Sequence, residues 1–308
     1  MSEQRRNELR DEQVVYAIHR QERTFLPSRE HCPLCPTRQG QAETEIPFPA
    51  FEIAVFENRF PAFEAPHGAA EVVVYTDDHD ASFGTLAPRR AEDLMWVWRQ
   101  RFQELGARED VDYVLIFENR GVEVGVTLHH PHGQIYGYPF LPPVPKLELA
   151  ADTRLGGCAL CGLLRAELED DQRVVFQNDG VVAYVPYAAR WPHEVHVVMR
   201  AHRPSLLECE AEELRLLAEA LQGVVRGYDA LFDRPFPYVM VVHQAPTTAP
   251  HPPSAGQGHL HVEFYPPLRT AGKLKYLAGS EQGAGTFISD VLPEESAARM
   301  REAIVRAA

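Results

Sequence analysis

Two hydrophobic periodicities alternate along this chain. Short runs of β-branched and aromatic residues predict β-strands, and apolar residues three or four positions apart predict amphipathic helices. Strands are expected at 72–75, 113–117, 174–176, 181–184, 195–199, 238–242 and 260–264, helices at 91–105 and 211–232, and a Pro/Gly/Ser-rich loop at 247–258. Because helices are interspersed with strands that look antiparallel, the pattern predicts an α+β fold with a mainly antiparallel sheet flanked by helices, not a parallel doubly wound sheet.

The elements and the reactive residues occur twice in the same order. Each half contains a Cys-x-x-Cys pair, then a strand with a histidine after it, a long helix, a further strand and a His-x-His run. The interval from Cys35 to His79 is 44 positions, and that from Cys161 to His202 is 41. Such self-similarity at a long period predicts two copies of one structural unit, at residues 1–145 and 146–308.

The paired cysteines indicate metal sites. Two thiols separated by two residues suit one tetrahedral ion, which needs two more ligands from elsewhere. The repeat supplies them and predicts two structural zinc sites, formed by Cys32, Cys35, His79 and His130 and by Cys158, Cys161, His202 and His259. Four protein ligands leave no open coordination position, so neither ion is expected to be catalytic. A thioredoxin-like redox pair is the alternative for either pair taken alone.

Composition narrows the class of protein. The chain has 308 residues, 45% of them hydrophobic, and a formal net charge of −14, which argues against nucleic acid or an anionic membrane as partner. The charged N-terminus has no apolar signal-peptide core, and no later run resembles a membrane span. We therefore expect a cytoplasmic protein, in which cysteine pairs are more often metal ligands or redox groups than disulfides.

The run from His130 to Gln134 carries the most specific chemistry. It places two imidazoles on alternate residues of an extended segment, followed by a glycine and an uncharged amide. Residues two apart on a strand point to the same face, so a metal can hold one ring while the other, that of His132, faces a substrate. A neutral imidazole is a nucleophile that needs no separate base when its second nitrogen donates to a fixed acceptor.

With these and further motifs, the chain resembles the galactose-1-phosphate uridylyltransferases, the transferase branch of the histidine-triad superfamily. His130 to Gln134 matches the family's His-Pro-His-Gly-Gln signature, and residues 117–121 match its Phe-Glu-Asn-x-Gly element. Phe-Glu-Asn at 56–58, the segment 185–194 and Glu-Phe-Tyr-Pro-Pro-Leu at 263–268 extend the resemblance over nearly the whole chain. It implies two tandem histidine-triad-like repeats in one sheet-based subunit of a homodimer.

The resemblance also implies an activity. His132 would attack the α-phosphorus of UDP-glucose, become a covalent uridylyl-histidine and pass UMP to galactose 1-phosphate in a ping-pong exchange. Its second ring nitrogen would donate to the backbone carbonyl of His130, and Gln134 would donate to a phosphoryl oxygen. The displaced group is a phosphate, which leaves without a proton, so an amide suffices where hydrolytic members of the superfamily carry a histidine.

A substrate-binding set follows from the same resemblance. Its members are Asn119, Gly125 and Thr127 at the phosphates, Arg20 and Arg23 near the sugar phosphate, Asn58 at the nucleoside, and Lys275 and Glu281 in a sugar-binding segment that reaches the partner subunit's site.

Three positions depart from the family. Arg59 after Asn58 stands where the family has an aspartate beside the uridine, and Phe287 stands where a glutamine helps to hold galactose. The second metal site of the better-known bacterial members maps to Glu148, His243, His261 and Glu263, where one histidine has become Glu. We favour the Cys158 set instead, because the repeat predicts it and thiolates bind zinc more tightly than carboxylates do.

Two other functions stay open. ADP-glucose phosphorylases resemble this chain in having a Cys-Cys-His-His site in each repeat, which keeps adenylyl transfer to phosphate as an alternative. A non-catalytic, zinc-scaffolded nucleotide-binding protein would need His130 but not His132. Gln134 and the arginine and threonine set argue against this second alternative, since a zinc scaffold does not require them.

Overall fold

The computed structural model describes residues 2–40, 43–247 and 258–308, so most of the loop expected at 247–258 lies outside the described residues. The strands are β1 (Glu3–Asn7), β2 (Glu12–Tyr16), β3 (Ala54–Glu57), β4 (Ala69–Val74), β5 (Tyr113–Arg120), β6 (His132–Tyr138), β7 (Val174–Gln177), β8 (Val181–Tyr184), β9 (Val195–Met199), β10 (Tyr238–His243), β11 (His261–Tyr265), β12 (Leu268–Thr270) and β13 (Lys273–Leu274). The helices are α1 (Pro88–Gly106), α2 (Pro143–Leu155), α3 (Ala159–Asp170), α4 (Ala211–Leu231) and α5 (Pro293–Ala307). Single turns are η1 (Ile18–Glu22), η2 (Arg29–His31), η3 (Phe83–Thr85), η4 (Val122–Val124), η5 (Leu206–Glu208) and the π-helical η6 (Ser280–Ala284).

The predicted α+β fold is confirmed, and each strand and helix expected from the hydrophobic pattern is present with ends shifted by a few residues. Several elements carry no such pattern and were not predicted. The hairpin of β1 and β2 is largely exposed and polar, and α2 begins with a proline in its first turn. The boundary between the two repeats, expected at residue 145, lies inside helix α2, which continues on both sides of it.

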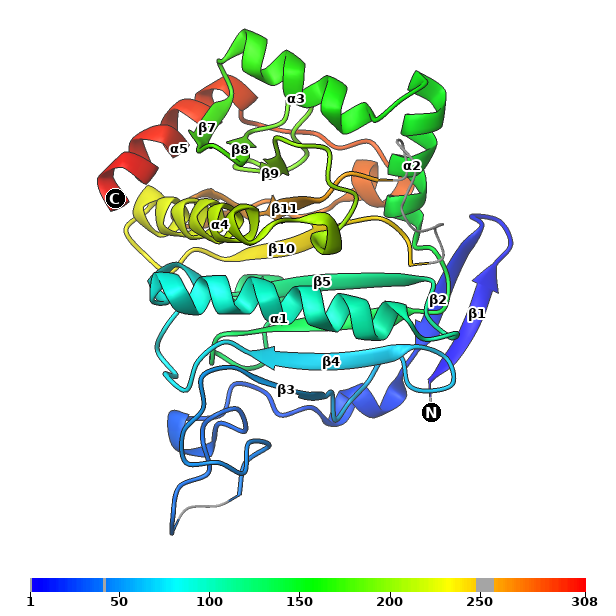
Figure 1. Cartoon of the computed structure of the whole chain (residues 1–308), viewed down its shortest axis with the longest axis vertical. Coiled ribbons are helices and arrows are strands. Elements are labelled where there is room, and N and C mark those ends of the chain that lie inside the picture. Colours follow the sequence, from blue (N-terminus) through cyan, green and yellow to red (C-terminus); the bar gives the residue numbers. More distant parts are fainter. Residues whose placement is uncertain (1, 41–42, 248–257) are drawn as a thin grey trace.

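One nine-stranded antiparallel sheet joins the two halves, in the order β3-β4-β6-β5-β10-β11-β9-β8-β7 (Figure 1). Phe117 of β5 pairs with Gln134 of β6, and Val241 of β10 pairs with Glu263 of β11, so Phe117 and Val241 hold equivalent places. They also pair with each other across the centre of the sheet. A pseudo-twofold axis therefore passes between β5 and β10, and it relates β3, β4, β6 and β5 to β8, β9, β11 and β10.

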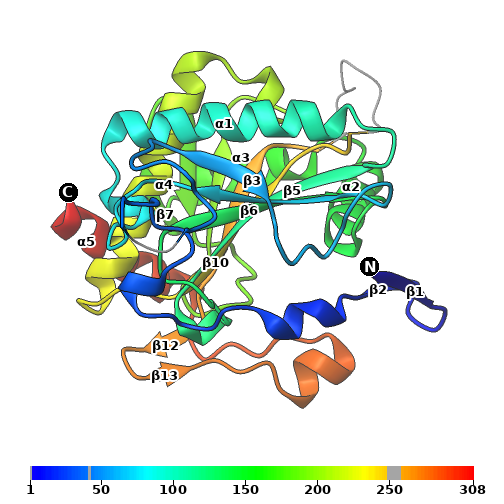
Figure 2. The ribbon, with the colours of Figure 1, turned by 90° about the horizontal axis from the view of Figure 1, so that it is seen from below.

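Alternation along the strands separates a core face from a polar face. Ile135 of β6 and Val262 of β11 are fully buried in the main hydrophobic cluster, which also contains residues of α1 and α4. These two helices lie across one face of the sheet, and the N-terminal segment and the β12–β13 ribbon lie on the other (Figure 2). Because side chains alternate along a strand, His132 and Gln134 point toward the face that carries the N-terminal segment.

None of the helices in the described part of the chain combines the length and the hydropathy needed to cross a lipid bilayer.

Glu118 is a buried carboxyl group in the central strand β5. Its side chain is 3% exposed, and Oε1 accepts a hydrogen bond from the hydroxyl of Tyr238 at 3.1 Å. Burial raises the pKa of Glu118 to about 7, and the nearby Arg120 guanidinium only partly opposes that rise. The folded protein therefore holds a proton on Glu118 at pH values where the unfolded chain has released it.

This proton gives the fold a pH dependence. Between the ordinary glutamate pKa and about 7, the folded state binds more protons than the unfolded state, so the free energy of unfolding falls as pH rises through that window. Glu118→Gln removes the ionisation, and we expect its stability relative to wild type to increase by up to roughly 3 kcal/mol from pH 5 to pH 8. Urea unfolding of both proteins at the two pH values measures this change. If the free energies of unfolding of Glu118→Gln and wild type differ by the same amount at pH 5 and at pH 8, Glu118 does not titrate in this way.

Candidate functional site

His132 is the first residue of β6, and its ring is fixed by the backbone two residues earlier. Nδ1 of His132 donates to the carbonyl oxygen of His130 at 2.7 Å. This bond keeps the proton on Nδ1 and leaves a lone pair on Nε2. Burial lowers the pKa of His132, which favours the neutral ring. His130 itself lies in a bend just before the strand, so only one of the two histidines is on a strand.

The glycine between His132 and Gln134 is required by close packing. A Cβ atom at Gly133 would lie 2.3 Å from the hydroxyl oxygen of Tyr75 and 3.0 Å from the carbonyl oxygen of Phe117. Real Cβ atoms do not approach an oxygen as closely as 2.3 Å, so any other residue would displace either the fully buried Tyr75 ring or β6 itself. Gly133 therefore holds the strand, and His132 with it, against β4 and β5.

Gln134 is oriented by two donors. Its Oε1 accepts from Nδ2 of Asn58 at 3.1 Å and from the hydroxyl of Tyr136 at 3.2 Å. With the carbonyl end of the amide occupied, the NH₂ end is the one that can donate outward. Tyr136 in turn accepts from Nη1 of Arg20 at 3.2 Å, which links the N-terminal segment to β6.

His132 borders two cavities. One, of about 120 Å³, is also lined by Arg23, Asn58, Thr127 and Gln134. The other, of about 520 Å³, is lined by residues that include Asn119. An imidazole placed between two cavities can contact one ligand group on each side.

Positive charge reaches this site from the N-terminal segment. Burial and the neighbouring Arg20 lower the pKa of Arg23, and the hydroxyl of Tyr136 only partly opposes this shift. A guanidinium in this setting suits a bound phosphate, which its planar fork can contact through two bonds.

Four members of the predicted set line neither cavity beside His132, namely Arg20, Gly125, Lys275 and Glu281. Gly125 is exposed, has a left-handed backbone conformation and follows directly after η4. Lys275 and Glu281 form a buried ion pair with each other, with Nζ and Oε1 3.2 Å apart. In a single chain, these two residues therefore belong to the C-terminal segment and not to the surroundings of His132.

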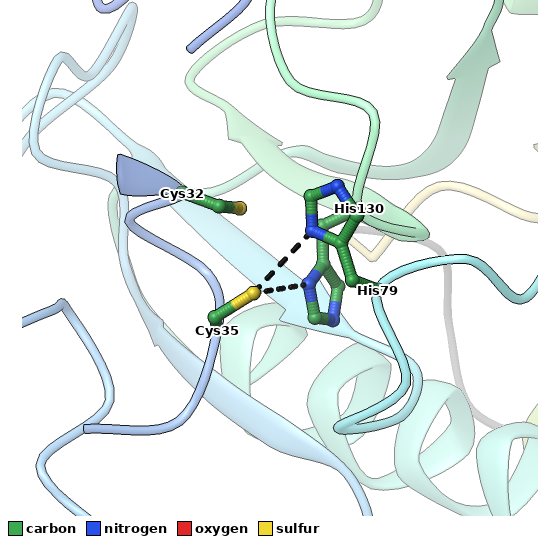
Figure 3. Close-up of side chains that lie close together, drawn as sticks. All are labelled: Cys32, Cys35, His79 and His130. Carbon is green, nitrogen blue, oxygen red and sulfur yellow. Dashed lines mark hydrogen bonds between the residues drawn. The ribbon is translucent and has the colours of Figure 1, made fainter. Parts of the chain in front are cut away.

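The first Cys-Cys-His-His set comes together beside β6 (Figure 3). Sγ of Cys35 lies 3.3 Å from Nδ1 of His79 and 3.5 Å from Nδ1 of His130, and the sulfur of Cys32 completes the group. Nε2 of His130 donates to the carbonyl oxygen of Thr76 at 2.7 Å, so its Nδ1 lone pair faces the thiols. Such a backbone partner is what orients a metal-ligating histidine.

The second set has the same arrangement in the C-terminal half. Nδ1 of His259 lies 3.5 Å from Sγ of Cys158 and 3.4 Å from Sγ of Cys161, and Nδ1 of His202 lies 3.6 Å from Sγ of Cys161. Nε2 of His259 donates to the carbonyl oxygen of Met199 at 2.9 Å. Cys158 differs from Cys32 in that it is the N-cap of a helix, α3.

Both sets fit a tetrahedral ion. Zinc–sulfur and zinc–nitrogen bonds of about 2.3 and 2.0 Å at tetrahedral angles place sulfur and nitrogen about 3.5 Å apart. The observed separations of 3.3 to 3.6 Å match this value. Burial raises the pKa of Cys35 and that of Cys158 to about 11, so both thiols would stay protonated until a cation binds and displaces the protons.

The alternative ligands for the second metal also lie together. Glu148, His243 and His261 form a third group able to hold an ion, with Nδ1 of His243 3.1 Å from Oε2 of Glu148. Glu263 contacts both histidines, at 3.8 Å from Nε2 of His243 and 3.5 Å from Nε2 of His261. The two candidate sites of the C-terminal half therefore use separate residues and do not exclude each other.

Two residues at the site were not predicted from the sequence. Tyr136 lies two residues after Gln134 on β6, so strand alternation alone could have placed it on the same face. Glu45 lines the smaller cavity and pairs with Nη1 of Arg59 at 3.2 Å. No sequence pattern marks Glu45, because its approach to Arg59 depends on the path of an irregular segment.

Comparison with known proteins gives a consistent result. Residues 1–142 match the profile for galactose-1-phosphate uridyl transferase, N-terminal domain, and residues 152–306 match that for the C-terminal domain. The galactose-1-phosphate uridylyltransferase of Thermotoga maritima is 38% identical over 323 aligned positions, which cover 98% of this chain and 98% of the relative. A solved uridylyltransferase structure aligns with a TM-score of 0.86 at 32% identity over 99% of both chains. An ADP-glucose phosphorylase from Arabidopsis thaliana with bound ADP-glucose aligns with a TM-score of 0.75 over 98% of this chain and 99% of that one, but at 21% identity it shows only a shared fold.

The metal content of cysteine variants tests the two sets. We expect about two zinc ions per chain in the purified protein and about one in Cys161→Ser or in Cys35→Ser, because a tetrahedral site that loses a thiolate binds zinc much more weakly. Elemental mass spectrometry of the dialysed proteins gives the count. Cys209→Ser is the matched control, since Cys209 is buried outside both sets and should keep both ions. Full zinc content in Cys161→Ser, or an equal loss in Cys209→Ser, would contradict the assignment.

Proposed function

Because the chain belongs to the galactose-1-phosphate uridylyltransferase family, we propose that it exchanges UMP between UDP-glucose and galactose 1-phosphate through a covalent uridylyl-histidine at His132. The observation that carries this proposal is the 2.7 Å hydrogen bond from Nδ1 of His132 to the carbonyl oxygen of His130. It presents the lone pair of Nε2, the atom that has to attack phosphorus.

In the first half-reaction, Nε2 of His132 attacks the α-phosphorus of UDP-glucose. The new P–N bond forms as the P–O bond to glucose 1-phosphate breaks, and the leaving phosphate carries away the electron pair without needing a proton. The NH₂ group of Gln134 donates to a phosphoryl oxygen, where negative charge has to be accommodated. Its orientation by Asn58 and Tyr136 supports this role.

In the second half-reaction, a phosphate oxygen of galactose 1-phosphate attacks the uridylyl-histidine. The P–N bond breaks, UDP-galactose forms, and His132 returns to its neutral state with the proton still on Nδ1. Because the same Nε2 receives and gives up the nucleotide, two substrates use one site in turn. This is the physical basis of a ping-pong exchange.

The binding residues take their proposed roles from the family. We assign Asn119, Gly125 and Thr127 to the phosphates, Arg20 and Arg23 to the sugar phosphate, Asn58 to the nucleoside, and Lys275 and Glu281 to the sugar. The position of Lys275 and Glu281 away from His132 supports a homodimer in which this segment serves the partner's site. We further propose that the chain divides into repeats at residue 145 and acts in the cytoplasm.

Zinc is proposed in both Cys-Cys-His-His sets as a structural ion. In the first set it would fix His130, whose carbonyl oxygen orients His132. Positioning of this kind can contribute several kcal/mol to catalysis, roughly 7–11 at its upper limit.

Uridylyl transfer and the alternative, adenylyl transfer to phosphate, differ in the base of the nucleotide that is transferred. One experiment distinguishes these two reactions. The purified protein is incubated with UDP-glucose or with ADP-glucose, and its intact mass is measured. We expect a gain of one UMP from UDP-glucose that is absent in His132→Ala and is removed by galactose 1-phosphate. An AMP adduct removed by phosphate would instead establish the phosphorylase reaction. No adduct with either donor would support a non-catalytic nucleotide-binding protein.

The orientation of Gln134 gives a second prediction. We expect Gln134→Ala to lower kcat by on the order of 100-fold, because it removes a donor to the transition state. Tyr136→Phe should lower kcat by about 10-fold, since the Gln134 amide loses one of two donors that orient it. Steady-state rates of UMP exchange measure both effects. Tyr138→Phe, two residues further along β6, is the control and should leave the rate unchanged. Equal rates for Tyr136→Phe and Tyr138→Phe would contradict the orienting role.

A further inference from the structure

The C-terminal half contains a cavity that the proposed reaction does not use. Its volume is about 380 Å³, and it lies between the helices α2 and α3 and the strands β8, β9 and β11. Apolar side chains such as Leu149, Leu160 and Leu163 line the helical side, and Tyr184 and Tyr187 add two aromatic rings. A cavity of this size can enclose a small organic ligand.

Strand register places this cavity at the pseudo-symmetric position of the small cavity beside His132. His132 pairs with Val74 across β6 and β4, and His261 pairs with Val198 across β11 and β9. Each cavity is also lined by the two residues between the paired cysteines, which are Pro33 and Leu34 in one half and Ala159 and Leu160 in the other.

The histidine of the second cavity has the same fixed ring. Nδ1 of His261 donates to the carbonyl oxygen of His259 at 2.7 Å, just as His132 does to His130. Its Nε2 therefore carries a lone pair, and this atom lies 3.5 Å from Oε1 of Glu263. Oε1 of Glu263 already lies 3.2 Å from Nε2 of His196, so Nε2 of His261 is the acceptor that a donor group of a ligand would use first.

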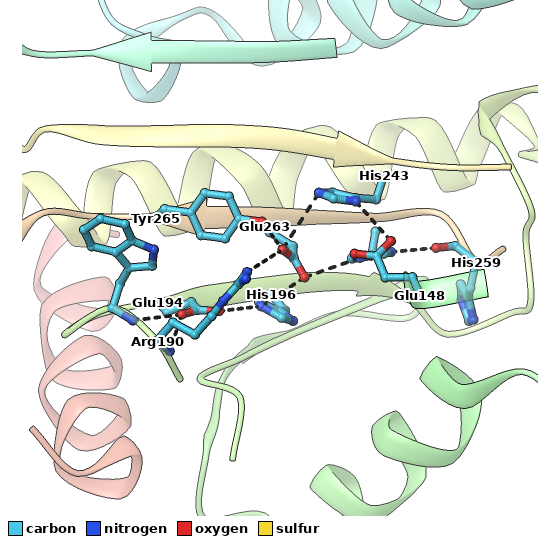
Figure 4. Close-up of polar contacts among 10 residues, drawn as sticks. Glu148, Arg190, Glu194, His196, His243, His259, Glu263 and Tyr265 are labelled. Carbon is cyan, nitrogen blue, oxygen red and sulfur yellow. Dashed lines mark hydrogen bonds and ion pairs between the residues drawn. The ribbon is translucent and has the colours of Figure 1, made fainter. Parts of the chain in front are cut away.

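The electrostatics of the second cavity are opposite to those beside His132. Glu263 holds the place of Gln134, and Glu148 and Glu194 add further carboxylates (Figure 4). The described lining residues offset this charge through the guanidinium of Arg190 and through His196, whose Nε2 lies 3.0 Å from Oε1 of Glu194 and 3.2 Å from Oε1 of Glu263. Arg190 is already engaged, with Nη2 3.6 Å from Oε2 of Glu263. A phosphate would meet net repulsion here, so the attack that His132 is proposed to make is disfavoured at His261.

An unpaired donor also borders the cavity. Gln244 lines it and is only 4% exposed. Its Oε1 accepts from the backbone N–H of Leu206 at 3.3 Å, but its Nε2 has no hydrogen-bond partner among the described residues. A buried amide N–H₂ without a partner is costly, but this nitrogen has almost no accessible surface. A ligand carbonyl would reach it only after the Gln244 side chain rotates toward the cavity.

We propose that this cavity is a second binding site, specific for a nucleoside without phosphate. The apolar and aromatic walls suit a planar base, Glu148 and His261 suit its N–H donors, and Gln244 suits a ring carbonyl once its side chain rotates toward the cavity. The choice of a nucleoside rests on the proposed function, because the equivalent cavity beside His132 is the one proposed to take the nucleotide. The second repeat would thus bind a nucleoside, as the first is proposed to do, but would not carry out the nucleotidyl transfer proposed for His132.

Equilibrium dialysis with radiolabelled uridine and adenosine tests the site. Saturating unlabelled UMP occupies the site at His132, and the label that still binds to the full chain is counted. We expect one of the two nucleosides to bind at about one molecule per chain. Raising the UMP concentration further should not reduce this binding. Ala151→Trp fills the cavity from α2 and should lower this binding at least 10-fold. Ala150→Trp adds the same side chain at an exposed neighbouring position outside the cavity and should retain it.

A second cavity variant and an independent measurement distinguish loss of the site from misfolding of the protein. Tyr187→Ala removes an exposed aromatic wall, so it should fold normally and still weaken nucleoside binding. The UMP adduct on His132 should form in all three variants, which reports on the proposed function independently. The inference would be overturned if no nucleoside binds in the presence of UMP, if UMP displaces the label, or if Ala151→Trp and Tyr187→Ala bind as well as wild type. A metal ion held by Glu148, His243 and His261 that blocks all nucleoside binding would overturn it too.

Discussion

The site around β6 is organised by the hydrogen bond that Nδ1 of His132 donates to the carbonyl oxygen of His130. It fixes the ring, the tautomer and the direction of the free lone pair in one contact. The carbonyl is itself fixed, because the ring of His130 is held between Cys35 and the backbone of Thr76. Gly133 then lets the strand continue against Tyr75 without a clash. A metal ion held by this set would therefore act on the proposed chemistry through the backbone and not through an open coordination position.

Duplication explains why this constraint appears twice with different consequences. The pseudo-twofold axis between β5 and β10 gives both halves a Cys-Cys-His-His set and a histidine whose Nδ1 donates two residues back. The side chain two residues further on decides the chemistry. Gln134 offers a neutral donor, whereas Glu263 adds negative charge to a cavity that already holds other carboxylates. Phosphoryl transfer is therefore compatible with the first half and disfavoured in the second.

Much of this architecture could be predicted from the sequence because it depends on local patterns. Strand and helix periodicity predicted the α+β fold, and the repeated order of cysteines and histidines predicted groups that the structure does bring together. Contacts between distant, irregular segments could not be predicted. The pairing of Glu45 with Arg59 depends on the path of a loop, and the exposed hairpin of β1 and β2 has no apolar face to reveal it.

We infer that the carbonyl oxygen of His130, by holding the proton on Nδ1 of His132, makes Nε2 of His132 the nucleophile. The most direct measurement uses protein labelled with ¹⁵N-histidine and treated with UDP-glucose, followed by NMR detection of coupling between phosphorus and nitrogen. We expect one phosphorus–nitrogen bond, to Nε2 of His132, with the proton still on Nδ1. A bond to Nδ1, or to any other histidine, would show that Nε2 of His132 is not the nucleophile.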